Sequence, residues 1–149
     1  MYTVSAIERL LYEYRDIPER KRELLIKMGE TQTFKLNAED TLKSAVYSHV
    51  PKVKEIQDSV YEAVQKITDE FDIHLTYYKN EIERINAEEK AMYEALKALD
   101  QYEHKIIEMR YLKNYRWESI VIKIPYERTQ CFKIRDEALQ KISENYNTD

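Results

Sequence analysis

Basic and polar side chains are concentrated between residues 110 and 135. This segment holds seven basic and two acidic residues, a local charge of +5, in a chain whose net charge is −4. The basic residues are Arg110, Lys113, Arg116, Lys123, Arg128, Lys133 and Arg135. Arginine and lysine bind phosphate groups, and side chains such as Gln130 can hydrogen-bond to base edges. These residue types favour binding to a nucleic acid through a local patch rather than through the whole chain.

Two short helices are expected to position this patch. Residues 117–124 make about two turns ended by Pro125, and residues 127–142 form a second helix. Apolar anchors on both are expected to pack the helices at a steep angle, as in a helix-turn-helix: Ile120, Ile124, Tyr126, Cys131 and Ile134. The positions facing away from the anchors are Arg128, Thr129, Gln130, Lys133 and Asp136, with Phe132 and Arg135 at the flanks. The pattern predicts that this outer face lies against DNA.

A third helix is expected to precede the pair. Asp100 can cap it, and Glu103 lies three residues on, which approximates a capping box. The helix continues to Leu112 and ends at a polar break, residues 114–116. We interpret Trp117 as a core anchor at the start of the next helix, and Cys131 as a packing residue rather than a redox sensor.

Residues 99–142 resemble the C-terminal region of the RinA/ArpU-type phage transcriptional regulators. The similar phrases are Ile-Ile-Glu-Met-Arg-Tyr-Leu (106–112), Trp-Glu-Ser-Ile (117–120) and Ala-Leu-Gln-Lys-Ile (138–142). That family region is itself similar to the promoter-reading fourth domain of bacterial sigma factors. The resemblance implies that Arg128, Thr129, Gln130 and Lys133 face bases and phosphates, with Arg116 and Lys113 near the DNA backbone. It covers about a third of the chain.

Four residues depart from the usual helix-turn-helix pattern. Val121 and Pro125 stand where such families have a small residue and a turn glycine. Proline cannot adopt a left-handed turn because its φ is fixed near −65°. Ile122 and Phe132 stand where solvent or DNA is expected, which leaves open a contact with another protein.

The N-terminal third of the chain predicts one interrupted helix followed by a loop. Residues 3–28 place apolar side chains on one helix face, and Pro18 either kinks this helix or starts a second one after Asp16. Gly29 is the only glycine and follows where a C-cap is expected. Residues 29–51 show no sustained period and are expected to form a loop that closes at residues 49–51.

A long amphipathic helix follows from Val53 to about Leu99. Its apolar residues alternate three and four positions apart, as in a coiled-coil seam, over about 70 Å. Residues 3–28 would span only about 38 Å and would cover roughly half of this stripe. The remainder needs the C-terminal domain or a second copy of the chain, so we hypothesise a homo-oligomer through residues 53–99.

The fold class expected from these elements is all-α, with a helical or coiled-coil-like region at 1–98 and a helix-turn-helix domain at 99–149. One glycine and three prolines leave few tight turns for a β-sheet. A single cysteine, no leader-like N-terminus and no long apolar run predict a cytoplasmic chain with no membrane partner. No pattern indicates an enzyme, a catalytic residue, a metal site or a cofactor.

Three functions follow from this sequence. The leading one is a phage or prophage transcriptional regulator that binds double-stranded DNA through its helix-turn-helix. A small-terminase-like packaging protein would combine the same motif with an oligomerising helical region. An adaptor that binds other proteins, for example RNA polymerase, would not need DNA.

Overall fold

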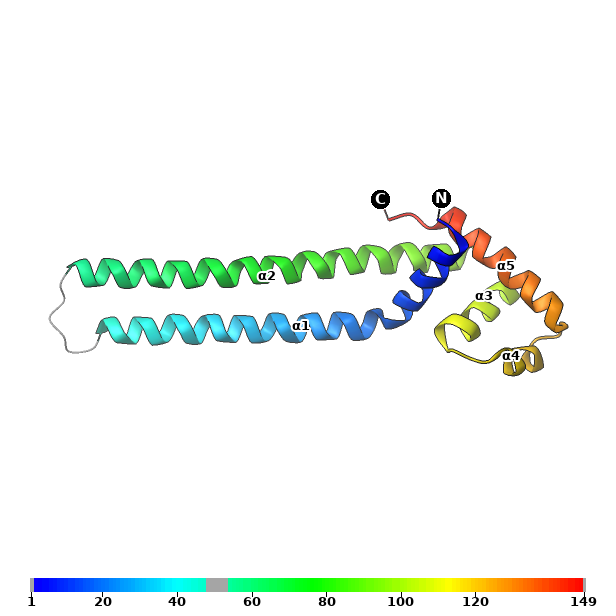
Figure 1. Cartoon of the computed structure of the whole chain (residues 1–149), viewed down its shortest axis with the longest axis horizontal. Coiled ribbons are helices and arrows are strands. Elements are labelled where there is room, and N and C mark those ends of the chain that lie inside the picture. Colours follow the sequence, from blue (N-terminus) through cyan, green and yellow to red (C-terminus); the bar gives the residue numbers. More distant parts are fainter. Residues whose placement is uncertain (1, 48–53, 149) are drawn as a thin grey trace. The chain divides into compact units, whose positions relative to one another are not determined.

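The chain is all-α, as expected. The computed structural model describes residues 2–47 and 54–148, and every regular element in those ranges is helical (Figure 1). The elements are α1 (Val4–Tyr47), α2 (Lys54–Lys97), α3 (Gln101–Ile107), a π-helical turn η1 (Glu108–Leu112), α4 (Trp117–Lys123) and α5 (Arg128–Asn145). Within the described ranges, no helix has the length and apolar character needed to cross a bilayer.

The helices belong to two compact units. The core unit comprises residues 1–19 and 84–149, and the hairpin unit comprises residues 20–83. Both long helices therefore contribute to both units. The predicted domain boundary between residues 98 and 99 falls inside the core unit, because the first turns of α1 and the last turns of α2 pack with the C-terminal helices.

The first hydrophobic cluster of the core unit joins segments from both ends of the chain. Ile7 and Leu11 from α1 pack with Met92 from α2, Ile107 from α3 and Leu139 from α5, and all five are buried. Two long-range hydrogen bonds reinforce this packing. The Tyr111 hydroxyl donates to Glu8 at 3.3 Å, and the Ser143 hydroxyl donates to the Tyr2 carbonyl at 2.6 Å. The N-terminus is thereby tied to α5.

The capping box at the start of α3 is confirmed. The Glu103 N–H donates to the Asp100 carboxylate at 2.9 Å, and the Asp100 N–H donates to the Glu103 carboxylate at 3.0 Å. The Glu103 side chain is buried and accepts a further hydrogen bond from Lys141 of α5 at 2.6 Å. The cap therefore also connects α3 to α5. The polar break after η1 is confirmed too, with Asn114 at φ 56°, a conformation that asparagine tolerates better than most residues.

The loop predicted for residues 29–51 is wrong over its described part, because α1 continues to Tyr47. The half-buried positions described in this part of α1 are Thr31, Lys35, Ala38, Glu39 and Leu42. They keep the spacing of a helix seam, but three of the five are polar, so hydrophobicity alone gives no period. Lys35 instead bonds Asp72 at 2.7 Å. The predicted loop end at residues 49–51, and Val53, lie outside the described residues.

Residues 54–97 form the long helix that the apolar pattern predicts. Its seam in the hairpin unit is covered by residues 20–47 of α1, which run antiparallel beside it (Figure 1). The predicted homo-oligomer through residues 53–99 rested on an apolar stripe that a short N-terminal helix would leave uncovered. Because α1 is longer than predicted, the prediction loses this support.

Neither Pro18 nor Gly29 ends a helix, because both lie inside α1. Pro18 lies inside a continuous helix, which agrees with the single-helix alternative. Gly29 also lies inside α1 with a negative φ, so the predicted C-cap is wrong. Nothing approaches within 4 Å of a Cβ built on Gly29. The glycine therefore fills no steric requirement in the hairpin.

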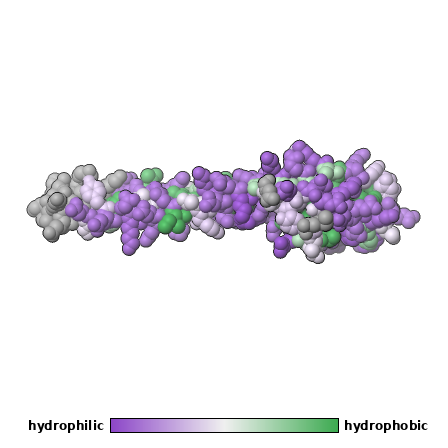
Figure 2. All heavy atoms as spheres, turned by 90° about the horizontal axis from the view of Figure 1, so that it is seen from above, coloured by the Kyte–Doolittle hydropathy of each residue, from purple (hydrophilic) through white to green (hydrophobic). Residues whose placement is uncertain are grey.

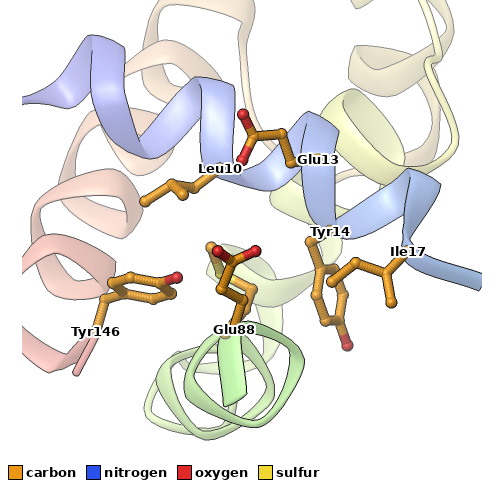
Figure 3. Close-up of a pocket in the computed structure, with 7 residues that line it drawn as sticks. Leu10, Glu13, Tyr14, Ile17, Glu88 and Tyr146 are labelled. Carbon is orange, nitrogen blue, oxygen red and sulfur yellow. The ribbon is translucent and has the colours of Figure 1, made fainter. Parts of the chain in front are cut away.

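Tyr146, which follows the last residue of α5, is buried. Its ring packs edge-on against Tyr2 with centroids 5.2 Å apart. Figure 3 shows that the Tyr146 hydroxyl and the Glu88 carboxylate point toward one another beside a small cavity lined also by Leu10 and Ile17. Burial, followed by the charge of Glu88, raises the pKa of Tyr146 to about 12.

Candidate nucleic-acid interface

A second hydrophobic cluster in the core unit holds the predicted helix-turn-helix together. Ile120 and Ile124 come from α4 and its end, Cys131 and Ile134 come from α5, and all four are buried as expected. Ile106 and Met109 from the preceding helix complete the cluster. The helical segment formed by α3 and η1 thus supports α4 and α5, as a further helix does in helix-turn-helix domains.

Tyr126 was expected among the buried anchors, and this is wrong, because its side chain is 39% exposed. Its ring makes an edge contact with Tyr102, with centroids 5.2 Å apart. Its carbonyl accepts a hydrogen bond from the Cys131 thiol at 3.7 Å. Tyr126 therefore fixes the turn through its ring edge and backbone rather than through burial.

The turn between α4 and α5 uses extended residues instead of a left-handed one. Ile124 has φ −120° and ψ 138°, and Glu127 has φ −67° and ψ 158°. Pro125 fits such a turn because extended backbone is compatible with its fixed φ. Val121 is half-buried and packs against the second cluster, so the larger side chain is accommodated there.

The outer face of α5 is open. Arg128, Thr129, Gln130 and Lys133 are all exposed, as the pattern predicted. The Arg128 guanidinium lies 3.8 Å from the Glu118 carboxylate, but both side chains are more than half exposed. Such a surface ion pair is worth little, so it competes weakly with a phosphate group. Glu127, at the N-cap, makes no side-chain hydrogen bond to the first turn.

Phe132 stands at a position where the helix-turn-helix pattern has solvent or DNA, and the structure shows what it contacts. It is half-buried and packs edge-on against Trp117, with ring centroids 4.7 Å apart. The Arg135 guanidinium lies over both rings, at 5.4 Å from Trp117 and 5.2 Å from Phe132. It also pairs with Asp136 at 2.9 Å. Arg135 is half-buried and engaged within the protein, whereas Arg128, which lies 5.6 Å from the Phe132 ring and 3.8 Å from Glu118, stays exposed.

The Trp117 ring connects the three helices of this region. The Arg110 guanidinium lies 5.4 Å from the Trp117 ring and donates to the Tyr115 carbonyl at 3.1 Å. Trp117 itself is half-buried against the second cluster, which fits its expected role as an anchor. Sequence reasoning missed that two arginines stack here. The spacing of Phe132 and Arg135, three residues apart on one helix, could have indicated it.

The remaining predicted contacts lie between η1 and α4. Lys113 and Arg116 are exposed, and the Lys113 ammonium lies 3.6 Å from Glu108. Ile122 on α4 is 83% exposed, as its position in the pattern indicated. Burial raises the pKa of the Cys131 thiol, which agrees with a packing role because a reactive cysteine has a lowered pKa.

Comparisons with models of known families, with curated proteins and with solved structures found no match. The candidate site therefore rests on the residues and geometry described above.

Proposed function

We propose that this protein is a sequence-specific, double-stranded DNA-binding transcriptional regulator that contacts DNA through α5. One observation carries the proposal. Four exposed side chains with the chemistry of DNA contacts, Arg128, Thr129, Gln130 and Lys133, share the outer face of a helix whose inner face is buried. A helix held in this way can enter the major groove, where its N-terminal residues contact base edges.

The proposal divides the exposed residues by role. Arg128, Thr129 and Gln130 occupy the first turn of α5, where the partial positive charge of the helix end favours phosphate. Lys133 lies about one turn further along. Lys113 and Arg116 approach the neighbouring DNA backbone. Arg135 is left out of the contact set because its guanidinium is occupied by two rings and Asp136.

The resemblance to RinA/ArpU-type phage regulators supports transcription, in a phage or prophage setting, over DNA packaging. RNA polymerase is then a candidate protein partner. A ring-sized oligomer in solution would instead favour a terminase-like role, whereas a monomer or dimer agrees with transcription.

The test replaces two cations of the exposed face. Arg128→Ala/Lys133→Ala should weaken binding to duplex DNA, measured by fluorescence anisotropy at several salt concentrations. If both side chains contact phosphates, the slope of log affinity against log salt should become shallower by about 1.8. An unchanged slope would show that the assigned face is wrong.

A matched control removes the same charge elsewhere. Lys66 and Lys79 are exposed in the hairpin unit, so Lys66→Ala/Lys79→Ala changes net charge by the same amount. This control should keep the wild-type slope. Equal losses in both double variants would mean that net charge, and not the α5 face, governs binding.

A protein-binding role for the same unit is favoured by one observation. Ile122 is 83% exposed on α4, beside the candidate DNA face. In an adaptor, Ile122→Ser would abolish capture of the partner, and wild-type protein would show no DNA binding even at low salt, where nonspecific contacts are strongest. Binding at low salt that Ile122→Ser leaves intact supports the DNA proposal instead.

A further inference from the structure

The hairpin unit has no buried core of its own. No residue is buried among those of the hairpin unit whose side chains the structure describes, 20–42, 44 and 58–83, whereas all twenty buried apolar residues of the described chain lie in the core unit. Seven large apolar side chains of the hairpin are more than half exposed: Leu25, Ile26, Phe34, Leu36, Tyr61, Ile73 and Tyr77. Two helices side by side can cover only the seam between them. Amphipathic helices gain most of their stability from packing an apolar face, so the hairpin needs a partner that covers its exposed apolar side chains.

One face of the hairpin is an open apolar hollow. It has a volume of about 660 Å³ and is lined by Phe34, Asn37, Ala38, Thr41, Leu42, Ile67 and Phe71. Phe34 stands at its border with 63% of its surface exposed. Figure 2 shows hydrophobic residues interrupting an otherwise hydrophilic surface along the hairpin. Exposed apolar surface gathered in a hollow, rather than scattered singly, marks an interaction site.

The opposite side of the same seam is closed by polar pairs. Lys35 bonds Asp72 at 2.7 Å, and the Thr68 hydroxyl donates to Glu39 at 2.7 Å. Thr68 and Asp72 each follow a residue that lines the hollow, so they lie about 100° further around α2. At this level of the described hairpin, the hollow face offers an apolar surface that spans both helices, and the other side of the seam is polar.

We propose that this hollow face docks on the same face of a second copy of the chain, so that two hairpins form a four-helix bundle. In this bundle Phe34 packs against Phe71 of the partner subunit, at the same height along the helices. The interface surrounds each exposed phenylalanine with the partner's apolar side chains. Four helices also provide the enclosed core that two cannot.

Charge favours a second copy and sets its direction. Residues 20–47 of α1 carry six basic and four acidic residues, and residues 54–83 of α2 carry three basic and eight acidic residues. A two-fold axis parallel to the helices places α1 (+2) opposite the partner's α2 (−5). A perpendicular axis would place α2 opposite α2, which repels. The parallel axis puts both hairpin tips at one end.

The register of the hairpin adds a specific contact to this arrangement. Lys27 lies seven residues before Phe34, on the same face of α1. Because Lys35 pairs with Asp72, Lys27 is level with Asn80 on α2, one residue before Glu81. The parallel axis therefore sets Lys27 within one residue of the height of Glu81 of the partner subunit. The dimer goes beyond the proposed DNA contact and does not depend on it, because its residues lie in the other unit.

Light scattering on the purified full chain tests the interface. The wild type should have twice the 18.0 kDa chain mass, and Phe34→Glu should have the single mass with unchanged helicity by circular dichroism. Leu36→Glu is the matched control, because Leu36 is 59% exposed but lies about 200° away from Phe34 around α1. It should remain dimeric. A monomeric wild type, a higher oligomer, or a dimeric Phe34→Glu would overturn the proposal.

If Phe34→Glu reduces helicity, Thr41→Lys replaces it as the interface variant. Thr41 is exposed in the single chain and lies on the same face, seven residues on. It should also give a monomer, and a dimeric Thr41→Lys would count against the face. Both variants should still bind DNA if α5 contacts DNA as proposed, so loss of the dimer and loss of DNA binding are separate results.

A distance measurement tests the direction. Glu23→Cys places a label at an exposed site near the base of the hairpin, and Cys131→Ser in the same protein removes the buried native thiol. With the parallel axis the two labels lie within about 25 Å, the width of a four-helix bundle plus label arms. A perpendicular axis through Ala38 would separate them by about 45 Å. The longer distance, by electron spin resonance, would overturn the tips-together arrangement.

Discussion

The core unit and the hairpin unit are built from the same two long helices, yet they differ in how completely they bury their side chains. In the core unit, Leu11 and Met92 are fully enclosed because residues of α3, η1 and α5 cover the pair of helices. In the hairpin unit, Ala38 and Phe71 occupy equivalent seam positions and remain half-buried. The difference lies in the number of layers around the seam, not in the seam itself.

This difference separates the two tasks that the molecule is proposed to perform. A DNA-reading helix must be held rigidly, and α5 is fixed by two hydrophobic clusters and by the Lys141–Glu103 contact. A surface for association must stay open in the single chain, and the hairpin keeps Phe34 exposed. The two proposals therefore assign the nucleic acid to the unit with a complete core and a second copy of the chain to the unit without one.

The largest expected effect comes from truncating the same residue type in each unit. Leu139→Ala should lower the free energy of unfolding by about 3 kcal/mol, because it removes a fully buried side chain and leaves a cavity. Leu75→Ala, at a half-buried position of the hairpin seam, should cost about 1 kcal/mol. Urea unfolding measures both, with Trp117 fluorescence reporting the core unit and circular dichroism reporting both units. Equal costs would contradict the contrast in burial.

A smaller effect concerns alkaline pH. The pKa of Tyr146 is raised to about 12, whereas a tyrosine in an unfolded chain titrates near 10. Between these values the unfolded state loses the proton and the folded state keeps it. The stability that Tyr146 contributes is therefore fully present below pH 10 and is lost as pH rises, by about 2 kcal/mol at pH 12.

The variant Tyr146→Phe removes that titration, so its stability should fall less steeply between pH 10 and pH 12. The measurement is urea unfolding monitored by Trp117 fluorescence at a series of pH values. Tyr77→Phe is the matched control, because Tyr77 lies in the hairpin unit and is 58% exposed. Tyr77→Phe should keep the wild-type slope, and a wild-type slope for Tyr146→Phe as well would contradict the raised pKa of Tyr146.

The contrast between the units also explains which features could be predicted from the sequence. The capping box at Asp100, the limits of α4 and the buried anchors of α5 follow from local rules about caps, prolines and apolar spacing. The outward position of Arg128 follows from the same spacing. The stacking of Arg135 on Phe132 is indicated by their spacing of three residues on one helix, but its stacking on Trp117 is not, because that depends on how two helices meet.

The hairpin was harder to predict because its seam is partly polar. Lys35 and Glu39 face α2 and form hydrogen bonds there, which no single-helix period indicates. Gly29 was predicted to cap the C-terminus of a helix, although α1 continues for eighteen residues beyond it to Tyr47. The predicted burial of Tyr126 failed for a related reason, since its ring meets only one other ring edge. Where contacts across helices replace apolar burial, sequence periodicity alone is insufficient.

The smallest expected effect tests whether α1 continues through Gly29. Gly29→Ala should stabilise the hairpin by about 0.5 to 1 kcal/mol, because glycine inside a helix costs backbone entropy and nothing lies within 4 Å of the added Cβ. The readout is the midpoint of thermal unfolding by circular dichroism, with the Trp117 fluorescence midpoint unchanged. Thr33→Ala is a control one turn further on, where the threonine hydroxyl donates to the Gly29 carbonyl at 3.0 Å. If residues 29–47 were a loop, Gly29→Ala would remove a favourable C-cap and destabilise the hairpin. The sign of the change therefore decides between a helix that ends at Met28 and one that reaches Tyr47.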